Sequence, residues 1–111
     1  MAEKSKIAEL LFHEKLTLAT GLIREIKVWR MPKSPRYPDG VKYRMALVDP
    51  TTGDVLILYD NHWPKGHHVH RAEVEEPYEF ASVADLMMDF LRESTEAERL
   101  YRENKENKNQ V

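Results

Sequence analysis

The sequence predicts an α+β fold in which an antiparallel sheet of about four strands is covered by one C-terminal amphipathic helix. Apolar and polar residues alternate over 22–31 and 41–48, and a turn-forming segment joins the second stretch to an apolar run at 55–59. Apolar residues then recur at helical spacing over 83–91. Strands followed by a single strong helix favour this class over a parallel βαβ arrangement.

The N-terminal part of the chain predicts two elements. Residues 4–14 carry Ile7, Leu10 and Leu11 at helical spacing, which predicts a short helix. The alternation over 22–31 then predicts a half-buried strand, with its apolar side chains on the core face.

Loops and turns set the order of the remaining strands. Residues 32–40 predict a loop, because three prolines there cannot donate to a β-ladder. The Asp-Pro-Thr-Thr-Gly-Asp segment at 49–54 predicts a hairpin turn, so 41–48 and 55–59 should pair antiparallel. The run 55–59 is apolar on both faces and predicts a central strand covered on both sides. Residues 67–72 predict a further antiparallel strand.

The C-terminal helix is the clearest single element. Ser82 is an N-cap with Asp85 three residues later, the spacing of a capping box. The predicted core stripe consists of Val83, Leu86, Met87, Phe90 and Leu91. The segment 101–111 is charged, has no apolar face, and predicts a disordered tail, which leaves 1–100 as a single domain.

Composition limits the class of protein. The chain has 111 residues and no cysteine, which excludes a disulfide framework and thiolate metal sites and fits a reducing cytoplasm. No stretch approaches the ~20 apolar residues of a membrane span. Residues 15–44 hold eight Lys or Arg against two acids, whereas 71–111 hold six against eleven. The basic block predicts either a phosphate-binding surface or a solvated face that attracts the acidic block.

Histidines are concentrated in one short segment. Four of the five lie between His62 and His70, directly after the apolar run. Histidine is the side chain whose unperturbed pKa lies nearest physiological pH, so a cluster points to proton transfer, metal binding or anion binding. On a strand, His68 and His70 should share a face and His67 should point to the other.

A motif around these histidines resembles a known family. The chain reads Tyr-Asp-Asn at 59–61, Lys-Gly at 65–66 and His-x-His at 68–70, with an amphipathic helix opening at Ser82. This pattern resembles the TumE family of toxin–antitoxin proteins over about Leu16 to Glu93. Relatives tend to carry glycines directly after the second motif histidine, where this chain has the residues 71–73.

The resemblance implies a toxin that is often encoded beside a small DNA-binding antitoxin, with RNA cleavage as a common activity for toxins of this size. It carries over the location of the motif but no catalytic roles. The partners it implies are therefore the antitoxin and RNA, with no membrane and with homo-oligomers left open.

The residues themselves support metal-independent acid–base cleavage of RNA as the leading hypothesis, with no cofactor. One of His68 and His70 would deprotonate the ribose 2′-hydroxyl and the other would protonate the leaving oxygen. A cation must stabilise the developing charge. The predicted catalytic residues are His68, His70, Lys65, Asp60 and Tyr78. The predicted substrate-binding residues are Tyr59, Asn61, Trp63, Arg30 and Arg44.

Two alternatives remain open. His68, His70 and Asp60 have the ligand chemistry of a divalent metal site in a metal-dependent hydrolase, although Lys65 would repel the ion and a further ligand would have to come from His62 or Glu76. In the second alternative, the chain is a non-catalytic module that binds protein or nucleic acid through its basic strands.

Each motif residue also has a purely structural interpretation. Asp60 and Asn61 would end a strand, Lys65-Gly66 would form a turn, and His62 and His67 would be loop residues. Trp63 would cover the core or offer a stacking surface.

Overall fold

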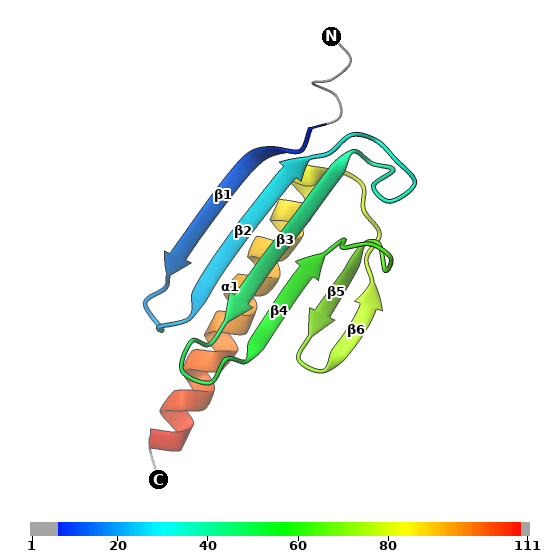
Figure 1. The fold of residues 1–111 in the computed structure, drawn as a ribbon. Helices are drawn as coiled ribbons and strands as arrows, with labels where there is room; N and C mark the ends of the chain where they lie inside the picture. The colour runs from blue at the N-terminus through cyan, green and yellow to red at the C-terminus, as the bar shows by residue number, and fades with distance from the viewer. Residues whose placement is uncertain (1–6, 110–111) are drawn as a thin grey trace.

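The structure, a computed structural model, describes residues 7–109 and consists of one six-stranded sheet with a long helix across one face (Figure 1). The strands are β1 (Glu9–Thr17), β2 (Ile23–Arg30), β3 (Val41–Val48), β4 (Val55–Asp60), β5 (His68–Arg71) and β6 (Val74–Pro77), and the helix is α1 (Val83–Asn109). All neighbouring strands are antiparallel and follow one another in chain order. The α+β class is confirmed, but the sheet has six strands rather than about four.

The first additional strand is β1, where helical spacing predicts a short helix. That prediction is wrong, because residues 9–14 belong to β1, which pairs with β2 from Glu9↔Arg30 to Thr17↔Ile23. Backbone hydrogen bonds to a neighbouring strand override weak local helical spacing here. The start of the predicted helix, residues 4–6, lies outside the described residues.

The second additional strand is β6, which forms a hairpin with β5. The chain reverses at Ala72 and Glu73, so Arg71 faces Val74 and His70 faces Glu75. All four residues of β6 are exposed. An exposed edge strand carries no hydrophobic alternation, which is why the sequence pattern does not predict it.

The core lies between α1 and one face of the sheet. Leu86 and Phe90 of the helix are fully buried, as the apolar stripe predicts, and the Phe90 ring packs edge-on against Tyr59 with centroids 5.9 Å apart. Leu22, directly before β2, is buried with them, and the buried strand residues are Ile26, Val28, Tyr43, Met45, Leu47, Ile57, Tyr59 and Val69. The Ser82 hydroxyl accepts a hydrogen bond from the Asp85 amide, which confirms the predicted N-cap.

The opposite face of the sheet, which we call the open face, has no helix over it in the described part of the chain (Figure 1). The prediction that residues 55–59 are covered on both sides is therefore wrong, and Leu58 on the open face is only partly buried. Because side chains alternate along a strand, buried Tyr59 and Val69 put Asp60, His68 and His70 on the open face.

A polar contact ties β5 to α1 on the core side. The Arg71 guanidinium donates two hydrogen bonds of 2.7 Å to the Glu93 carboxylate, which also accepts one from the Tyr59 hydroxyl. The hydrogen bonds from Arg71 are the main cause that holds the pKa of Glu93 below its usual value, and the one from Tyr59 adds to their effect.

Helix α1 continues through Asn109, whereas the sequence predicts a disordered tail from residue 101. The Tyr101 hydroxyl donates a hydrogen bond of 3.1 Å to Asp49, and Arg99 pairs with Glu96 and Glu103 along the helix. Ion pairs at these spacings support the charged last turns of the helix, of which Tyr101 still packs against the core. No helix among the described residues combines the length and apolar character needed to span a membrane.

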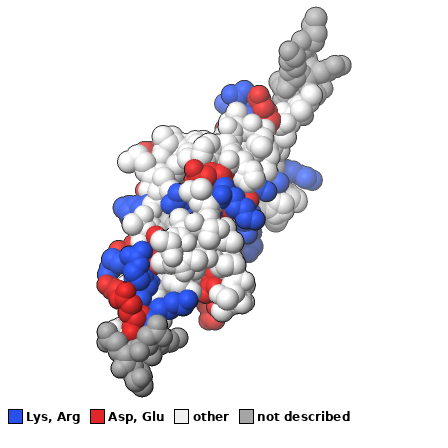
Figure 2. Space-filling view, turned by 90° about the vertical axis from the view of Figure 1, so that its left-hand side faces the viewer, with Lys and Arg blue, Asp and Glu red and all other residues white. Residues whose placement is uncertain are grey.

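Within residues 7–109, the ion pairs of the basic block are made with acids of β1 and β2 rather than with the acidic block 71–111. Figure 2, which faces the β1 side, shows Lys and Arg atoms next to Asp or Glu atoms at several places. Arg24 with Glu14 and Arg30 with Glu9 are pairs between β1 and β2.

We predict that Ala72→Gly stabilises the protein by about 1 kcal/mol, because Ala72 has φ 56°, a left-handed conformation that costs an L-residue about this amount. Urea denaturation compares the variant with wild type, and Ala84→Gly, in α1, is a control that should destabilise. A loss of stability in Ala72→Gly would contradict the strained turn.

We predict that Glu93 stabilises the fold in a pH-dependent way. Its pKa is lowered in the folded state, so its contribution is complete above the ordinary value of 4.5 and is lost as pH falls through the folded-state value. The free energy of unfolding of wild type and Glu93→Gln should therefore converge between pH 5 and pH 3. Glu96→Gln, at an exposed ion pair, should change little at either pH; a constant difference for Glu93→Gln would contradict the prediction.

Candidate functional site

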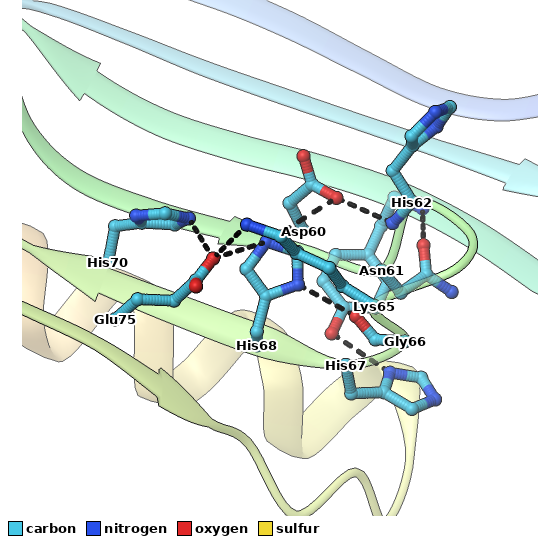
Figure 3. Close-up of polar contacts among 10 residues, drawn as sticks. Asp60, Asn61, His62, Lys65, Gly66, His67, His68, His70 and Glu75 are labelled. Carbon is cyan, nitrogen blue, oxygen red and sulfur yellow. Dashed lines mark hydrogen bonds and ion pairs between the residues drawn. The ribbon is translucent and has the colours of Figure 1, made fainter.

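The candidate site lies on the open face where β4, β5 and β6 meet. Asp60 ends β4, His68 and His70 lie on β5, and Glu75 lies on β6 (Figure 3). Asp60 faces His68 and His70 faces Glu75 in the strand register. The His68 and His70 rings have centroids 5.1 Å apart, so the prediction that they share a face is confirmed.

Asn61 anchors the loop that leads from β4 to β5. Its buried side chain donates a hydrogen bond of 2.9 Å to the Val41 carbonyl and accepts one of 2.9 Å from the Tyr43 amide. The side chain thus satisfies two backbone groups of β3 beyond the end of β4. The loop continues through a cis Trp63–Pro64 bond to Gly66, which has φ 72°.

His68 is oriented by the backbone of this loop. Its Nδ1 lies 2.7 Å from the Gly66 carbonyl oxygen, and a carbonyl only accepts, so Nδ1 carries the hydrogen. In the neutral ring, Nε2 then holds the lone pair. This Nε2 lies 3.9 Å from Glu75 Oε1 and 4.0 Å from Asp60 Oδ1. Because the His68 side chain is only 9% exposed, its orientation is well constrained.

One oxygen of Glu75 accepts hydrogen bonds from both Lys65 and His70. Glu75 Oε1 accepts a hydrogen bond of 2.7 Å from Lys65 Nζ and lies 2.9 Å from His70 Nε2 (Figure 3). The Lys65 ammonium is the main reason that the pKa of Glu75 lies below its usual value. The ionised carboxylate only accepts, so His70 Nε2 is the donor in this contact.

Asp60 borders the cluster without making a short contact to the imidazoles. Its Oδ1 accepts a hydrogen bond of 2.6 Å from the His62 amide, which is the Asx turn that the structural interpretation predicts. The Gly66 carbonyl, rather than Asp60, selects the His68 tautomer. A cavity of about 290 Å³ beside these groups is lined by Leu58, Asp60, His62, Trp63, Pro64, Lys65, His68 and His70.

The model of the family described as Toxin TumE matches residues 4–99. The chain belongs to the TumE toxin family. No curated protein and no solved structure matched it.

In this TumE family member, the structure does not bring two predicted site residues to the histidines. The Tyr78 hydroxyl donates a hydrogen bond of 2.6 Å to Asp89 of α1, and the Tyr78 ring packs against Tyr59 with centroids 5.2 Å apart. Both tyrosines therefore lie on the core side of the sheet, across from His68. Burial is the main cause that raises the pKa of each well above its usual value, which does not suit proton donation.

The other predicted substrate-binding residues fall into two groups. Arg44 is exposed on the open face opposite Asp60, and Trp63 is exposed in the loop with the Arg36 guanidinium 4.5 Å from its ring centroid. Arg30, in contrast, pairs with Glu9 at the end of β2, and Asn61 is occupied by the backbone of β3.

His67 belongs to a separate cluster, as its predicted opposite orientation implies. Its Nε2 lies 2.7 Å from Asp39, its Nδ1 lies 3.0 Å from the Tyr43 hydroxyl, and its ring stacks on Phe80. These contacts tie the loops together and leave His67 outside the open-face site.

The sequence pattern does not indicate Glu75, whose carboxylate contacts both Lys65 and His70. The neighbouring Glu76, which the sequence offers as a metal ligand, pairs instead with Arg71 at 2.9 Å. The missing signal was the β5–β6 hairpin register, which puts Glu75 beside His70.

Proposed function

We propose that this protein is the toxin of a prokaryotic toxin–antitoxin system and cleaves RNA by metal-independent acid–base catalysis at His68 and His70. The supporting observation is the convergence of Lys65 Nζ and His70 Nε2 on one Glu75 oxygen, at 2.7 and 2.9 Å. A carboxylate oxygen and a phosphate oxygen are both anionic acceptors, so the groups that hold Glu75 suit a phosphodiester. Glu75 lies on an exposed edge strand, from which its side chain can turn to solvent.

The hydrogen bonds of the site suggest a different role for each histidine. His68 is the general base, because the Gly66 carbonyl leaves its Nε2 lone pair free to take the proton of the ribose 2′-hydroxyl. Asp60, 4.0 Å from this nitrogen, favours the imidazolium that forms. The 2′-oxygen then bonds to phosphorus as the bond from phosphorus to the 5′-oxygen breaks.

His70 is the general acid in this scheme. Its Nε2 already donates to an anion, and in the imidazolium form His70 would transfer this proton to the leaving 5′-oxygen and become neutral. Lys65 Nζ would stabilise the negative charge that develops on the phosphate. The products are a 2′,3′-cyclic phosphate and a 5′-hydroxyl end, with the proton gained by His68 balancing the one lost by His70.

The open face next to the histidines offers a path for the RNA strand. Lys27, Arg44, Asp60 and His68 are successive cross-strand neighbours on β2, β3, β4 and β5. This row would place two cations on the phosphates beside the cleaved one. The exposed Trp63 at the edge of the site gives a surface on which a base can stack.

We predict that the purified protein cleaves mixed RNA in EDTA and that His68→Ala or His70→Ala lowers the rate by roughly 10²–10⁴, the usual contribution of a general acid or base. The measurement is the rate of product formation, with the ends identified as 2′,3′-cyclic phosphate and 5′-hydroxyl. An RNA with a 2′-deoxy sugar at the cleavage position should resist cleavage.

The matched control is His62→Ala, which removes an exposed loop histidine next to the site and should leave the rate unchanged. Equal cleavage by wild type and the His68→Ala/His70→Ala double variant would overturn the proposal. Loss of wild-type cleavage in EDTA would indicate instead that the protein is a metal-dependent hydrolase.

We predict that Lys27→Glu/Arg44→Glu weakens RNA binding at least tenfold and makes it less dependent on salt, because two phosphate contacts are lost. Fluorescence anisotropy with a labelled single-stranded RNA at several salt concentrations measures this. Arg99→Glu/Arg102→Glu, which makes the same charge change on exposed positions of α1, is the control and should bind as wild type. Equal weakening by both variants would indicate net charge rather than a path on the open face.

A non-catalytic binding module is the second candidate, and the two cations Lys27 and Arg44 on the open face favour it. Salt-dependent RNA binding by wild type, with no cleavage at any RNA concentration, would establish this alternative. A toxin family also implies an antitoxin, and we propose a small DNA-binding protein encoded next to this gene as the partner. Co-expression should suppress toxicity and co-purify both chains.

A further inference from the structure

Three metal-ligating side chains of the open face lie within reach of a single cation. His68, His70 and Glu75 each offer one ligand atom, and these atoms lie within 4.8 Å of one another. This is the one such group of three that the described residues contain. We propose that these three residues bind a divalent transition metal ion of the Zn²⁺ type.

The orientation of His68 supports this site. Metal-bound histidines generally donate their second ring N–H to a carbonyl or carboxylate, which fixes the tautomer and the direction of the ligating lone pair. The contact of 2.7 Å between His68 Nδ1 and the Gly66 carbonyl has this form. Because the ring is nearly buried on a strand, its Nε2 lone pair is held in place before any ion arrives.

The ligand set and its spacing suit the same ions. Two imidazoles and one carboxylate favour Zn²⁺, Fe²⁺, Co²⁺ or Ni²⁺ over Mg²⁺ and Ca²⁺. Bond lengths near 2.0–2.1 Å in a tetrahedral site separate ligand atoms by roughly 3.3 Å. Glu75 Oε1 lies 2.9 Å from His70 Nε2 and 3.9 Å from His68 Nε2, so small side-chain rotations suffice once the ion displaces the hydrogen from His70 Nε2. The adjoining cavity leaves room for water at the fourth position.

Glu75 is a better third ligand than Asp60, which the sequence suggested. Asp60 Oδ1 is held by the His62 amide at 2.6 Å, whereas Glu75 lies between both histidines. Lys65 opposes the ion, because its ammonium lies 2.7 Å from Glu75 Oε1. Its side chain is 60% exposed, however, and an exposed ion pair of this kind contributes little, so Lys65 can withdraw to solvent.

Metal binding would suppress the proposed cleavage, since the ion takes the His68 lone pair that the general base requires. This consequence rests on the proposed function, but the binding itself does not. Metal binding is therefore tested without RNA, so that the metal site and the proposed RNA cleavage can be refuted independently.

The experiment is a titration of the tag-free, metal-stripped full chain with ZnCl₂ by calorimetry, and with CoCl₂ by visible absorption. We expect one ion per chain, with a tetrahedral cobalt spectrum. Glu75→Gln should weaken binding at least tenfold, and Lys65→Met should tighten it, because the competing ammonium is removed. The matched control, Glu76→Gln, changes the neighbouring carboxylate that pairs with Arg71 and should bind as wild type.

Glu75 and Lys65 are exposed, so these variants test the site without a change in the core. No binding by wild type, or equal affinity of wild type and Glu75→Gln, would overturn the metal site. RNA cleavage measured in EDTA on the same proteins reports on the proposed function separately. Added ZnCl₂ should inhibit wild type more strongly than Glu75→Gln; equal inhibition of both would overturn the suppression of cleavage through this site.

Discussion

The histidine site depends on the alternation of side chains across β4 and β5, because a shift of one residue would turn every side chain of a strand to the other face. Tyr59 and Val69 are almost fully buried against α1. Their burial forces Asp60 and His70 onto the open face. The hydrophobic contacts that stabilise the fold thus also place these polar side chains on the open face. No apolar packing on the open face is needed to position them.

Two polar interactions reinforce this register, one on the core side of β5 and one in the loop that follows β4. On the core side, Arg71 binds Glu93 through two hydrogen bonds and so holds β5 against the helix. At the loop, the Asn61 side chain pairs with backbone groups of Val41 and Tyr43. A shifted register would lose both the packing of Tyr59 and Val69 and these hydrogen bonds. Each buried backbone group left without a partner would then cost about 1–3 kcal/mol. The Gly66 carbonyl is held in position against His68 as a result.

The sequence predicts those features that follow from local periodicity. A period of two predicts that His68 and His70 share a face, and the helical stripe predicts that Leu86 and Phe90 are buried; the structure confirms both. The exposed edge strands β1 and β6 were not predicted, because neither pattern marks a strand whose side chains are mostly in solvent. Glu75 joins the histidines only through the β5–β6 register, a pairing that the local pattern of β6 does not indicate.

Tyr78 shows a different limit of sequence reasoning. It lies close to the histidines in the chain, but the turn into α1 brings it to the core side, where it bonds to Asp89. Proximity in sequence predicts proximity in space only within one element or one turn. The same limit explains why Glu76, although adjacent to Glu75, contacts Arg71 on the other side of β6.

Lys65, His70 and Glu75 contact one another in the unliganded site. The chemistry of a bound ligand would decide which of these side chains stay in place. A phosphate oxygen needs N–H donors, so it would keep Lys65 and His70 and displace the Glu75 carboxylate. A metal ion needs lone pairs, so it would keep Glu75 and His68 and displace Lys65. Removal of the Glu75 charge should therefore favour phosphate and disfavour metal, whereas removal of the Lys65 charge should do the reverse. Opposite responses to the two substitutions follow from charge and lone-pair requirements alone, so they separate an anion site from a metal site even though both use His70.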